Sequence, residues 1–370
     1  MRILITGANG FIGKNLAVQL REKGAHELLL HTRASTPQEL ADAVSRADFV
    51  FHLAGANRPV TQDEFTTVNE GLTRELCRLI EATGRTVPLV LTSSTQAIQD
   101  NLYGRSKRAA EDVVLAHAER SGAAAIVYRL PNVFGKWCRP NYNSVVATFC
   151  HNIATGLPIT VNEAAPPLRL VYIDDVVSDF LRLVDAPPAT SGYREVAPVY
   201  ESTVAYLAAS IRGFAESRTT LTTPRVGTGL TRALYSTYLS YLPPASFAYD
   251  VPRHEDPRGA FVEMLKTPDS GQFSYFTAFP GVTRGEHYHH TKTEKFLVIK
   301  GKANFGFRHI TTGEVHHLVV EGGTGQIVET VPGWTHNITN IGTDELIVML
   351  WANEIFDRSA PDTIALKVNT

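Results

Sequence analysis

Short apolar runs alternate with amphipathic segments along the first half of the chain. In the amphipathic segments, apolar residues recur at helical spacing, which is typical of a helix with one buried face. Repeated strand–helix units predict a parallel sheet covered by helices on both faces, a doubly wound α/β fold. The expected strands are 2–5, 27–31, 49–53, 87–92 and 124–128, with helices expected at 14–23 and 69–82.

The pattern changes near residue 240, where Tyr241-Leu242-Pro243-Pro244 is typical of a linker. Beyond it, short strand-like runs are separated by Gly and Pro turns, and helical periodicity is almost absent. This predicts a small antiparallel barrel or jelly roll. We therefore expect two domains, residues 1–243 and 244–370, and strands in the second at 273–279, 295–299, 303–308, 326–329 and 346–351.

Composition agrees with this division and excludes several classes of protein. A chain of 370 residues is longer than one compact core usually spans. Its net charge of −2 gives no electrostatic reason to expect nucleic acid or a membrane surface as a partner. The three cysteines, Cys77, Cys138 and Cys150, are far apart, so we expect reduced thiols in a cytoplasmic protein. We find no signal-peptide pattern and no apolar stretch long enough to span a bilayer.

A glycine-rich turn follows the first strand and precedes the first helix. Its spacing is Gly-x-x-Gly-x-x-Gly. Gly7 permits a tight turn, Gly10 lets the backbone approach a pyrophosphate, and Gly13 allows close packing of the helix on the strand. The position at a strand-to-helix turn predicts a dinucleotide site. Its expected cofactor-binding residues are Gly7, Asn9, Gly10, Phe11, Ile12 and Gly13.

The end of the second strand bears on which dinucleotide binds. An NAD site usually places Asp or Glu here for the ribose 2′-hydroxyl, but this strand ends in His31, Thr32 and Arg33. His31 and Arg33 suit a 2′-phosphate, so we predict NADP(H). The alternative is that Arg33 is only a solvated loop cation.

A candidate proton-transfer site follows the strand at 87–92. Ser94 comes directly after it, and Tyr103 and Lys107 lie four residues apart, on one face of an expected helix. A lysine ammonium beside a phenol lowers the phenol's pKa, so that the tyrosine can exchange a proton with a carbonyl group near neutral pH. Ser94 would hydrogen-bond the same carbonyl oxygen.

These features resemble extended short-chain dehydrogenases/reductases over about residues 1 to 240. The resemblance includes His52-Leu53-Ala54-Gly55, Pro131-Asn132-Val133-Phe134-Gly135 and Val171-Tyr172-Ile173-Asp174-Asp175-Val176. It implies a Rossmann-type fold in which Ser94, Tyr103 and Lys107 are catalytic. It also implies that Leu53, Ala54 and Gly55 flank the cofactor with Tyr103 and Lys107, and that Asn132 lies near a nucleotide-sugar pocket.

Three reaction types occur in that family. Sugar 4,6-dehydratases carry Asp-Glu where this chain has Thr95 and Gln96, so a dehydratase is disfavoured. Epimerases acting at C4 recycle tightly held NAD, which fits poorly with Arg33. A reductase that consumes NADPH fits best.

The second half contains Gly281-x5-His287-x-His289-x4-Glu294-x6-Gly301 and, further on, Pro332-Gly333-Trp334-Thr335-His336. Alternation places His287 and His289 on one face of a strand, and Glu294 comes from the next strand. Three imidazoles and a carboxylate suit Zn, Fe, Mn or Ni. Both segments match the spacing of cupin motifs, which implies an all-β cupin barrel whose metal ligands are His287, His289, Glu294 and His336.

Residues 256–263 resemble the entry strand of nucleotide-sugar 3,5-epimerases, which are cupins that act on 4-keto sugars. The resemblance implies that Arg258 and Glu263 contact substrate. That family's catalytic histidine and lysine fall on His287 and Glu294, which are metal ligands in our interpretation. The base of this barrel therefore stays unidentified.

With both halves in this order, the whole chain is similar to the bifunctional capsule-biosynthesis enzymes of the CapF type, notably at residues 135–144 and 235–243. The similarity implies C3 epimerisation of a UDP-2-acetamido-2,6-dideoxy-4-hexulose in the cupin. Reduction at C4 with NADPH would then give UDP-2-acetamido-2,6-dideoxy-L-talose. Zinc and a homodimer are implied in the same way. Three alternatives stay open: a non-catalytic metal- and sugar-binding cupin, a 4-epimerase with bound NAD, and a cupin that mainly builds the oligomer.

Overall fold

The computed structural model describes residues 1–57, 61, 64–256, 259–262, 265, 267, 271–354 and 359–369. The chain forms two compact units. The N-terminal unit comprises Met1–Phe134, Asn141–Ser144 and Leu168–Ser202, and the C-terminal unit comprises Gly135–Pro140, Val145–Pro167 and Thr203–Thr370. Residues 203–243, which we expected in the first domain, thus pack in the C-terminal unit. The functional boundary at residue 243 stays a prediction.

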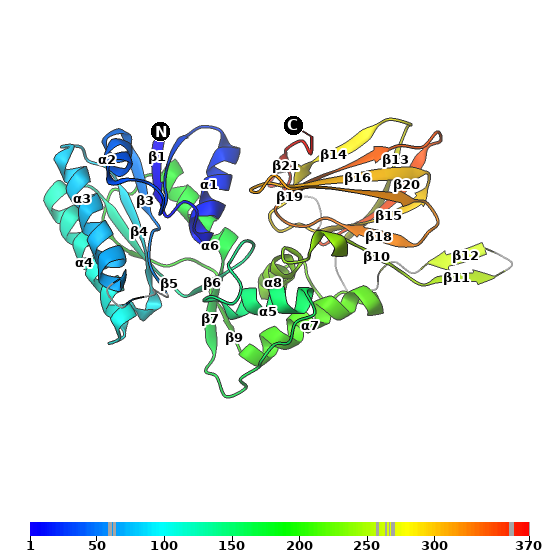
Figure 1. Cartoon of the computed structure of the whole chain (residues 1–370), viewed down its shortest axis with the longest axis horizontal. Coiled ribbons are helices and arrows are strands. Elements are labelled where there is room, and N and C mark those ends of the chain that lie inside the picture. Colours follow the sequence, from blue (N-terminus) through cyan, green and yellow to red (C-terminus); the bar gives the residue numbers. More distant parts are fainter. Residues whose placement is uncertain are drawn as a thin grey trace. The chain divides into compact units, whose positions relative to one another are not determined.

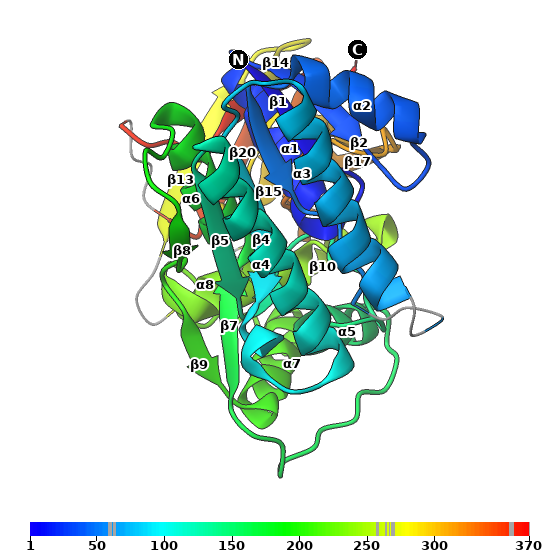
Figure 2. The same ribbon diagram turned by 90° about the vertical axis from the view of Figure 1, so that its left-hand side faces the viewer.

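The N-terminal unit is built on a six-stranded sheet with the order β2-β1-β3-β4-β5-β8, in which every pair of neighbours is parallel. Helices α2, α3 and α4 lie on one face, and α1 and α6 lie on the other (Figures 1 and 2). A second sheet joins β6, β7 and β9. The elements are β1 (Arg2–Thr6), α1 (Phe11–Lys23), β2 (Glu27–His31), α2 (Pro37–Arg46), β3 (Phe49–His52), the π-helix η1 (Phe65–Gly71), α3 (Leu72–Ala82), β4 (Leu89–Ser94), the 3₁₀ helix η2 (Thr95–Ile98), α4 (Leu102–Ser121), β5 (Ala125–Leu130), β6 (Asn132–Phe134), β7 (Leu168–Tyr172), α6 (Ile173–Asp185), β8 (Gly192–Arg194) and β9 (Tyr200–Ser202).

The sequence of this sheet explains its burial. The central strands are continuous apolar runs, as expected for strands covered on both faces. Phe49, Val50 and Phe51 in β3 are fully buried, and Leu89 and Val90 in β4 are too. The predicted doubly wound parallel sheet is confirmed, and the expected strand at 27–31 has the observed bounds.

The C-terminal unit contains two five-stranded antiparallel sheets, with the orders β10-β18-β15-β20-β13 and β17-β16-β19-β14-β21. Phe296 of one sheet packs against Phe305 of the other, with ring centroids 5.9 Å apart. Helices α5, α7 and α8 pack on one another, and β11 and β12 form a hairpin (Figure 1). The elements are α5 (Val145–Ala154), α7 (Val204–Thr220), α8 (Gly229–Leu239), the 3₁₀ helix η3 (Pro244–Ser246), β10 (Ala248–Asp250), β11 (Arg253–Asp256), β12 (Gly259–Val262), β13 (Gln272–Ala278), β14 (Thr283–Tyr288), β15 (Glu294–Lys300), β16 (Lys302–His309), β17 (Val315–Glu321), β18 (Gln326–Glu329), β19 (Trp334–Asn340), β20 (Leu346–Ala352) and β21 (Ile364–Ala365).

The antiparallel all-β architecture expected after residue 244 is therefore confirmed. The prediction of a linker at residues 241–244 is wrong, because this segment is packed and not free. The Tyr241 hydroxyl donates to the carbonyl of Cys138, and Leu242 is buried, because this segment lies inside the C-terminal unit.

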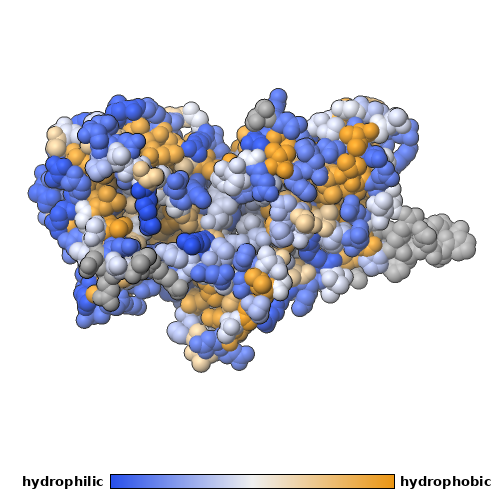
Figure 3. All heavy atoms as spheres, viewed as in Figure 1, coloured by the Kyte–Doolittle hydropathy of each residue, from blue (hydrophilic) through white to orange (hydrophobic). Residues whose placement is uncertain are grey.

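The surface has the mixed character of ordinary proteins. On the face seen in Figure 3, apolar and polar residues are interspersed over both units. Among the described residues, the most exposed large apolar side chains are Tyr275 and Phe279, each 72% exposed. Among the helices that the structure describes, none is both long and apolar enough to cross a bilayer.

An ionic cluster connects helix α7 with the sheet β10-β18-β15 inside the C-terminal unit. Lys295 and Glu329 are buried and form an ion pair, and the Lys295 ammonium also donates to the Tyr249 hydroxyl at 3.0 Å. Arg218 of α7 lies 3.3 Å from the second oxygen of Glu329. Each charge in this buried cluster depends on its partner, because water is excluded.

Glu329→Gln is expected to destabilise the protein by about 3–5 kcal/mol, because it leaves the buried Lys295 ammonium unpaired. Chemical denaturation measures this loss. The double variant Lys295→Met with Glu329→Gln should recover part of it, since no unpaired ammonium remains.

The matched control is Glu321→Gln, which breaks the exposed pair with Lys302 (2.8 Å) and should cost less than about 1 kcal/mol. Equal losses for Glu329→Gln and the control would contradict the role of the buried cluster.

Candidate active site and metal centre

The glycine turn packs so closely that side chains do not fit. Gly7 has a φ of +68°, and a Cβ there would lie 2.7 Å from the Ala54 nitrogen. At Gly13 a Cβ would lie 2.3 Å from the Gly7 carbonyl oxygen. Helix α1 begins directly after Gly10, without a side-chain cap. The backbone N–H groups in the first turn of α1 therefore have no partner within the helix. They point toward the glycine-rich segment, as a pyrophosphate-binding helix requires.

The end of β2 lies beside this turn, since the Ala8 N–H donates to the His31 carbonyl at 3.1 Å. Arg33 is exposed in the following turn. His31 is half-buried, and burial lowers the pKa of its imidazole, which makes it neutral at physiological pH. Of the two side chains expected to meet a 2′-phosphate, only Arg33 then carries a charge. The preference for NADP(H) stays a prediction.

The three predicted catalytic side chains come together at the carboxyl end of β4. Ser94 ends this strand, and its side chain lies close enough to Tyr103 to lower that residue's pKa in part. Tyr103 and Lys107 lie in the first two turns of α4. The Lys107 ammonium donates to the carbonyl of Thr92 at 2.7 Å, and the Tyr103 hydroxyl donates to Asn57 Oδ1 at 3.0 Å.

The electrostatics of this site correct one expectation. We expected Lys107 to lower the pKa of Tyr103, but that pKa is raised, first of all by burial. The reason is that desolvation penalises the charged form of each group. Burial likewise lowers the pKa of Lys107 to about 8, against a smaller raising effect of Glu111.

Asn69, which organises the loop that carries Gly55, is a functional residue that the sequence analysis missed, because no motif contains it. Its amide nitrogen donates to Ser106 Oγ at 2.9 Å and to the Ala56 carbonyl at 3.2 Å, and its amide oxygen accepts from the Ala56 N–H at 2.8 Å. A Cβ at Gly55 would lie 3.2 Å from Asn69 Oδ1 and 3.6 Å from Lys107 Nζ. Leu53, Ala54 and Gly55 thus run between the glycine turn and Lys107, where the family resemblance expects cofactor contacts.

The expected substrate residues remain untested. The Asn132 amide donates to the carbonyl of Arg169 at 3.1 Å, and its side chain is exposed. Arg258 and Glu263 lie outside the described residues. Their roles stay predictions.

The four predicted metal ligands form one cluster in the C-terminal unit. One ligand atom from each of His287, His289, Glu294 and His336 lies within 4.8 Å of the others. Glu294 Oε2 is 3.2 Å from His289 Nε2 and 3.5 Å from His336 Nε2. Strand β14 ends at Tyr288, one residue before His289, but the His287 and His289 rings still lie together edge to face, with centroids 4.9 Å apart.

The donor set fits a divalent transition metal. Burial lowers the pKa of His287 to about 4 and lowers that of His336, so both imidazoles are neutral, as metal ligands must be. The four residues would hold the ion through three imidazole nitrogens and a carboxylate oxygen. Lys292 lies 2.8 Å from the other oxygen of Glu294, which keeps that oxygen oriented.

The C-terminal segment 359–369 positions this cluster, a feature that the sequence analysis missed. The backbone carbonyl of Asp362 contacts His289 Nδ1, which turns Nε2 toward the other ligands. The Asp362 carboxylate accepts from the N–H groups of His290, Thr291 and Lys292 at 2.6 to 2.8 Å. Strand β21 pairs with His287 and Tyr288 of β14.

A dinucleotide-type turn beside a Ser–Tyr–Lys set, on a parallel sheet, defines the class of the N-terminal unit, and comparisons with known proteins agree. Residues 3–196 match the NAD dependent epimerase/dehydratase family, and residues 254–364 match the polysaccharide biosynthesis C-terminal domain. The chain is 56% identical over 368 residues to a UDP-2-acetamido-2,6-beta-L-arabino-hexul-4-ose reductase of Pseudomonas aeruginosa, covering 100% of this chain and 99% of the relative.

Solved structures give the same result. The capsular polysaccharide assembling protein CapF from Staphylococcus aureus is 39% identical, with a TM-score of 0.67, covering 99% of this chain and 100% of that one. MoeE5 in complex with UDP-glucose and NAD is 22% identical with a TM-score of 0.51 over 57% of this chain and 80% of its own, a likeness of fold alone. The chain therefore belongs to the NAD dependent epimerase/dehydratase family and, over its full length, to the CapF type within it.

Gly13→Ala is expected to abolish dinucleotide binding, because a Cβ 2.3 Å from the Gly7 carbonyl must displace the turn. Titration of NADPH fluorescence measures this, with circular dichroism as the check on folding. Gly213→Ala is the matched control, since a Cβ there meets nothing within 4 Å. Wild-type NADPH affinity in Gly13→Ala would contradict the assignment of the turn.

Asp362→Asn is expected to weaken metal retention by about 10- to 100-fold, because it disturbs the segment that orients His289. Competition with a chelator, followed by metal analysis, measures the affinity. The control Asp344→Asn changes an exposed carboxylate on another loop and should retain wild-type affinity. Equal affinities in both variants would show that the C-terminal segment does not position the site.

Proposed function

We propose that this protein reduces the C4 ketone of a UDP-2-acetamido-2,6-dideoxy-4-hexulose with NADPH and yields UDP-2-acetamido-2,6-dideoxy-L-talose. The observation that carries the proposal is the convergence of Ser94, Tyr103 and Lys107 beside the glycine turn. The 56% identical relative is named as a reductase of a UDP-linked 4-ketose, which supports an oxidoreductase acting on a UDP-4-keto sugar. NADP(H), zinc, a homodimer and a cytoplasmic location belong to the same proposal.

The chemistry of the site follows from its residues. NADPH supplies a hydride to C4 of the sugar when it is bound. The Tyr103 hydroxyl donates its proton to the C4 oxygen, so that the C=O double bond becomes a C–OH group and Tyr103 is left as a phenolate. Ser94 orients the carbonyl by a hydrogen bond. Burial disfavours the phenolate of Tyr103, and the charge of the Lys107 ammonium offsets part of this cost when the phenolate forms.

We also propose that the C-terminal unit first epimerises C3 of the same sugar. A proton at C3 is acidic only while C4 is a ketone, because the resulting carbanion is then held as an enolate. Reduction at C4 removes this acidity, so epimerisation must precede reduction. A metal held by His287, His289, Glu294 and His336 would supply a Lewis acid to the ketone if a coordination position is open.

A second candidate function is favoured by the number of ligands. Four protein ligands are typical of closed structural metal sites, whereas catalytic sites usually keep one position for water or substrate. The C-terminal unit would then bind metal and sugar without catalysis, and only the reductase would turn over. Deuterium uptake at C3 in the absence of NADPH distinguishes the two functions.

Tyr103→Phe is expected to abolish NADPH oxidation, by at least about 10²-fold, because the proton donor to the C4 oxygen is lost. C3 exchange should continue unchanged, since it depends on the other site. NMR of the 4-keto sugar nucleotide in deuterated buffer, with and without NADPH, measures both reactions in one sample.

Tyr206→Phe, at a half-exposed tyrosine of α7, is the matched control and should keep both activities. Loss of C3 exchange together with reduction in Tyr103→Phe would contradict separate sites. If the wild-type protein takes up no deuterium at C3, the C-terminal unit is not an epimerase, and only the proposed reductase function is supported.

A further inference from the structure

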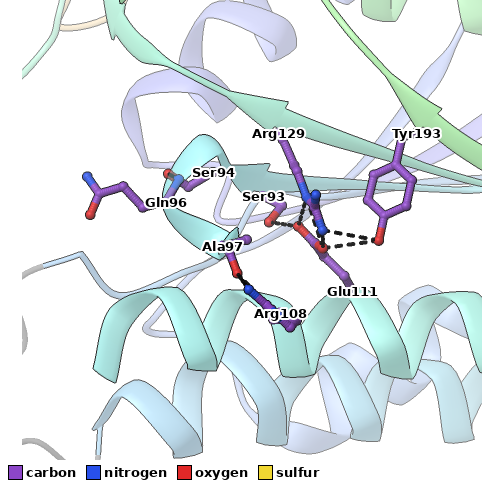
Figure 4. A network of polar contacts seen from close by, with 8 residues as sticks. All are labelled: Ser93, Ser94, Gln96, Ala97, Arg108, Glu111, Arg129 and Tyr193. Atoms are coloured by element: carbon purple, nitrogen blue, oxygen red, sulfur yellow. Dashed lines mark hydrogen bonds and ion pairs between the residues drawn. The ribbon is translucent and has the colours of Figure 1, made fainter. Parts of the chain in front are cut away.

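A fully buried carboxylate lies behind the proposed reductase site. Glu111 of α4 has no exposed surface. It accepts a hydrogen bond from the Ser93 hydroxyl, from Arg129 Nε at 3.0 Å and Nη2 at 2.6 Å, and from the Tyr193 hydroxyl at 3.2 Å. Figure 4 shows all three partners pointing at this one carboxylate from strands of the sheet. Glu111 therefore joins α4 to β4, β5 and β8.

One of its partners is the immediate neighbour of a proposed catalytic residue. Ser93 directly precedes Ser94 in β4, and Glu111 follows Lys107 by four residues, on the same face of α4. The bond between Ser93 and Glu111 thus fixes the strand that carries Ser94 against the helix that carries Tyr103 and Lys107.

Glu111 affects the site through its charge as well as through its hydrogen bonds. Among the groups that interact with Lys107, Glu111 comes from its own helix, His52 from the end of β3, and the Thr92 carbonyl from β4. His52 is neutral, because burial lowers its pKa to about 3. Glu111 is therefore an anion that favours the protonated form of the buried Lys107, although Arg129 balances part of its charge.

We propose that Glu111 is a positioning residue of the reductase, which holds Ser94 in register with Tyr103 and Lys107 and maintains the charge of Lys107. This inference rests on the proposed function, because it assumes that these three residues carry out the reduction. Glu111 itself touches neither substrate nor cofactor.

Glu111→Gln tests both parts, since glutamine keeps the shape of the side chain but removes its charge and replaces one of the two acceptor oxygens with a donor NH2 group. We expect kcat to fall about 10- to 100-fold, with KM for NADPH and for the sugar changed little. We also expect the alkaline limb of the kcat profile to move to lower pH by about one unit, because Lys107 loses its proton more readily without the nearby anion.

Two further variants separate position from charge. Ser93→Ala keeps the carboxylate, so kcat should fall while the alkaline limb stays where it is. Glu81→Gln is the matched control: Glu81 of α3 accepts from His117 and Arg120 of the same helix α4, at 2.9 and 2.7 Å, but away from β4. Glu81→Gln should change neither kcat nor the alkaline limb of its pH profile.

An unmoved alkaline limb in Glu111→Gln, or equal effects of Glu111→Gln and Glu81→Gln, would overturn the proposal. If Glu111→Gln does not fold, wild-type kcat in Ser93→Ala overturns it. A wild-type protein that oxidises no NADPH with any UDP-4-keto sugar contradicts the proposed function instead. In that case the pH dependence of Lys107 acetylation, read by mass spectrometry in wild type and Glu111→Gln, still tests the effect on charge.

Discussion

The candidate active site depends on the parallel pairing of β1, β3 and β4. Thr6 is in register with His52, and His52 with Leu91, so these strands end at the same edge of the sheet. The glycine turn, the loop from Leu53 to Asn57 and Ser94 follow these ends and therefore meet at one place. Ligands of open parallel sheets bind at this carboxyl edge for the same reason. An antiparallel neighbour would place its loop at the opposite edge.

Much of this arrangement was predictable, because its signals are local. Strand–helix alternation specified the sheet, and the spacing of Gly7, Gly10 and Gly13 specified the turn, since a close backbone approach tolerates no Cβ. The spacing of Tyr103 and Lys107 on a helix brought both side chains to one face. Likewise, the histidine spacing at 287, 289 and 336 predicted a cluster that the structure assembles.

The rest depended on contacts between distant residues of ordinary type. Asn69 lies in a π-helical turn within an expected helix, and its role exists only because η1 places it against Ala56 and Ser106. Asp362 follows His289 by 73 residues in a segment without a periodic pattern. The pKa of Tyr103 was predicted in the wrong direction because a sequence shows the neighbouring charge but not the burial.

Two buried carboxylates show how the same residue type serves different purposes. Glu111 receives hydrogen bonds from a guanidinium and two hydroxyls, all of which can donate at neutral pH, so both of its oxygens have donors. Glu294 instead faces the imidazole nitrogens of His289 and His336. A neutral imidazole can turn a lone pair toward the carboxylate, and such a contact is repulsive unless a proton or a cation lies between them. Lys292 offsets part of the charge of Glu294 at its other oxygen. Because burial lowers the pKa of His336, a metal ion between the carboxylate and the imidazoles would supply the rest, as the proposed metal site requires, whereas the donors around Glu111 leave no room for such an ion.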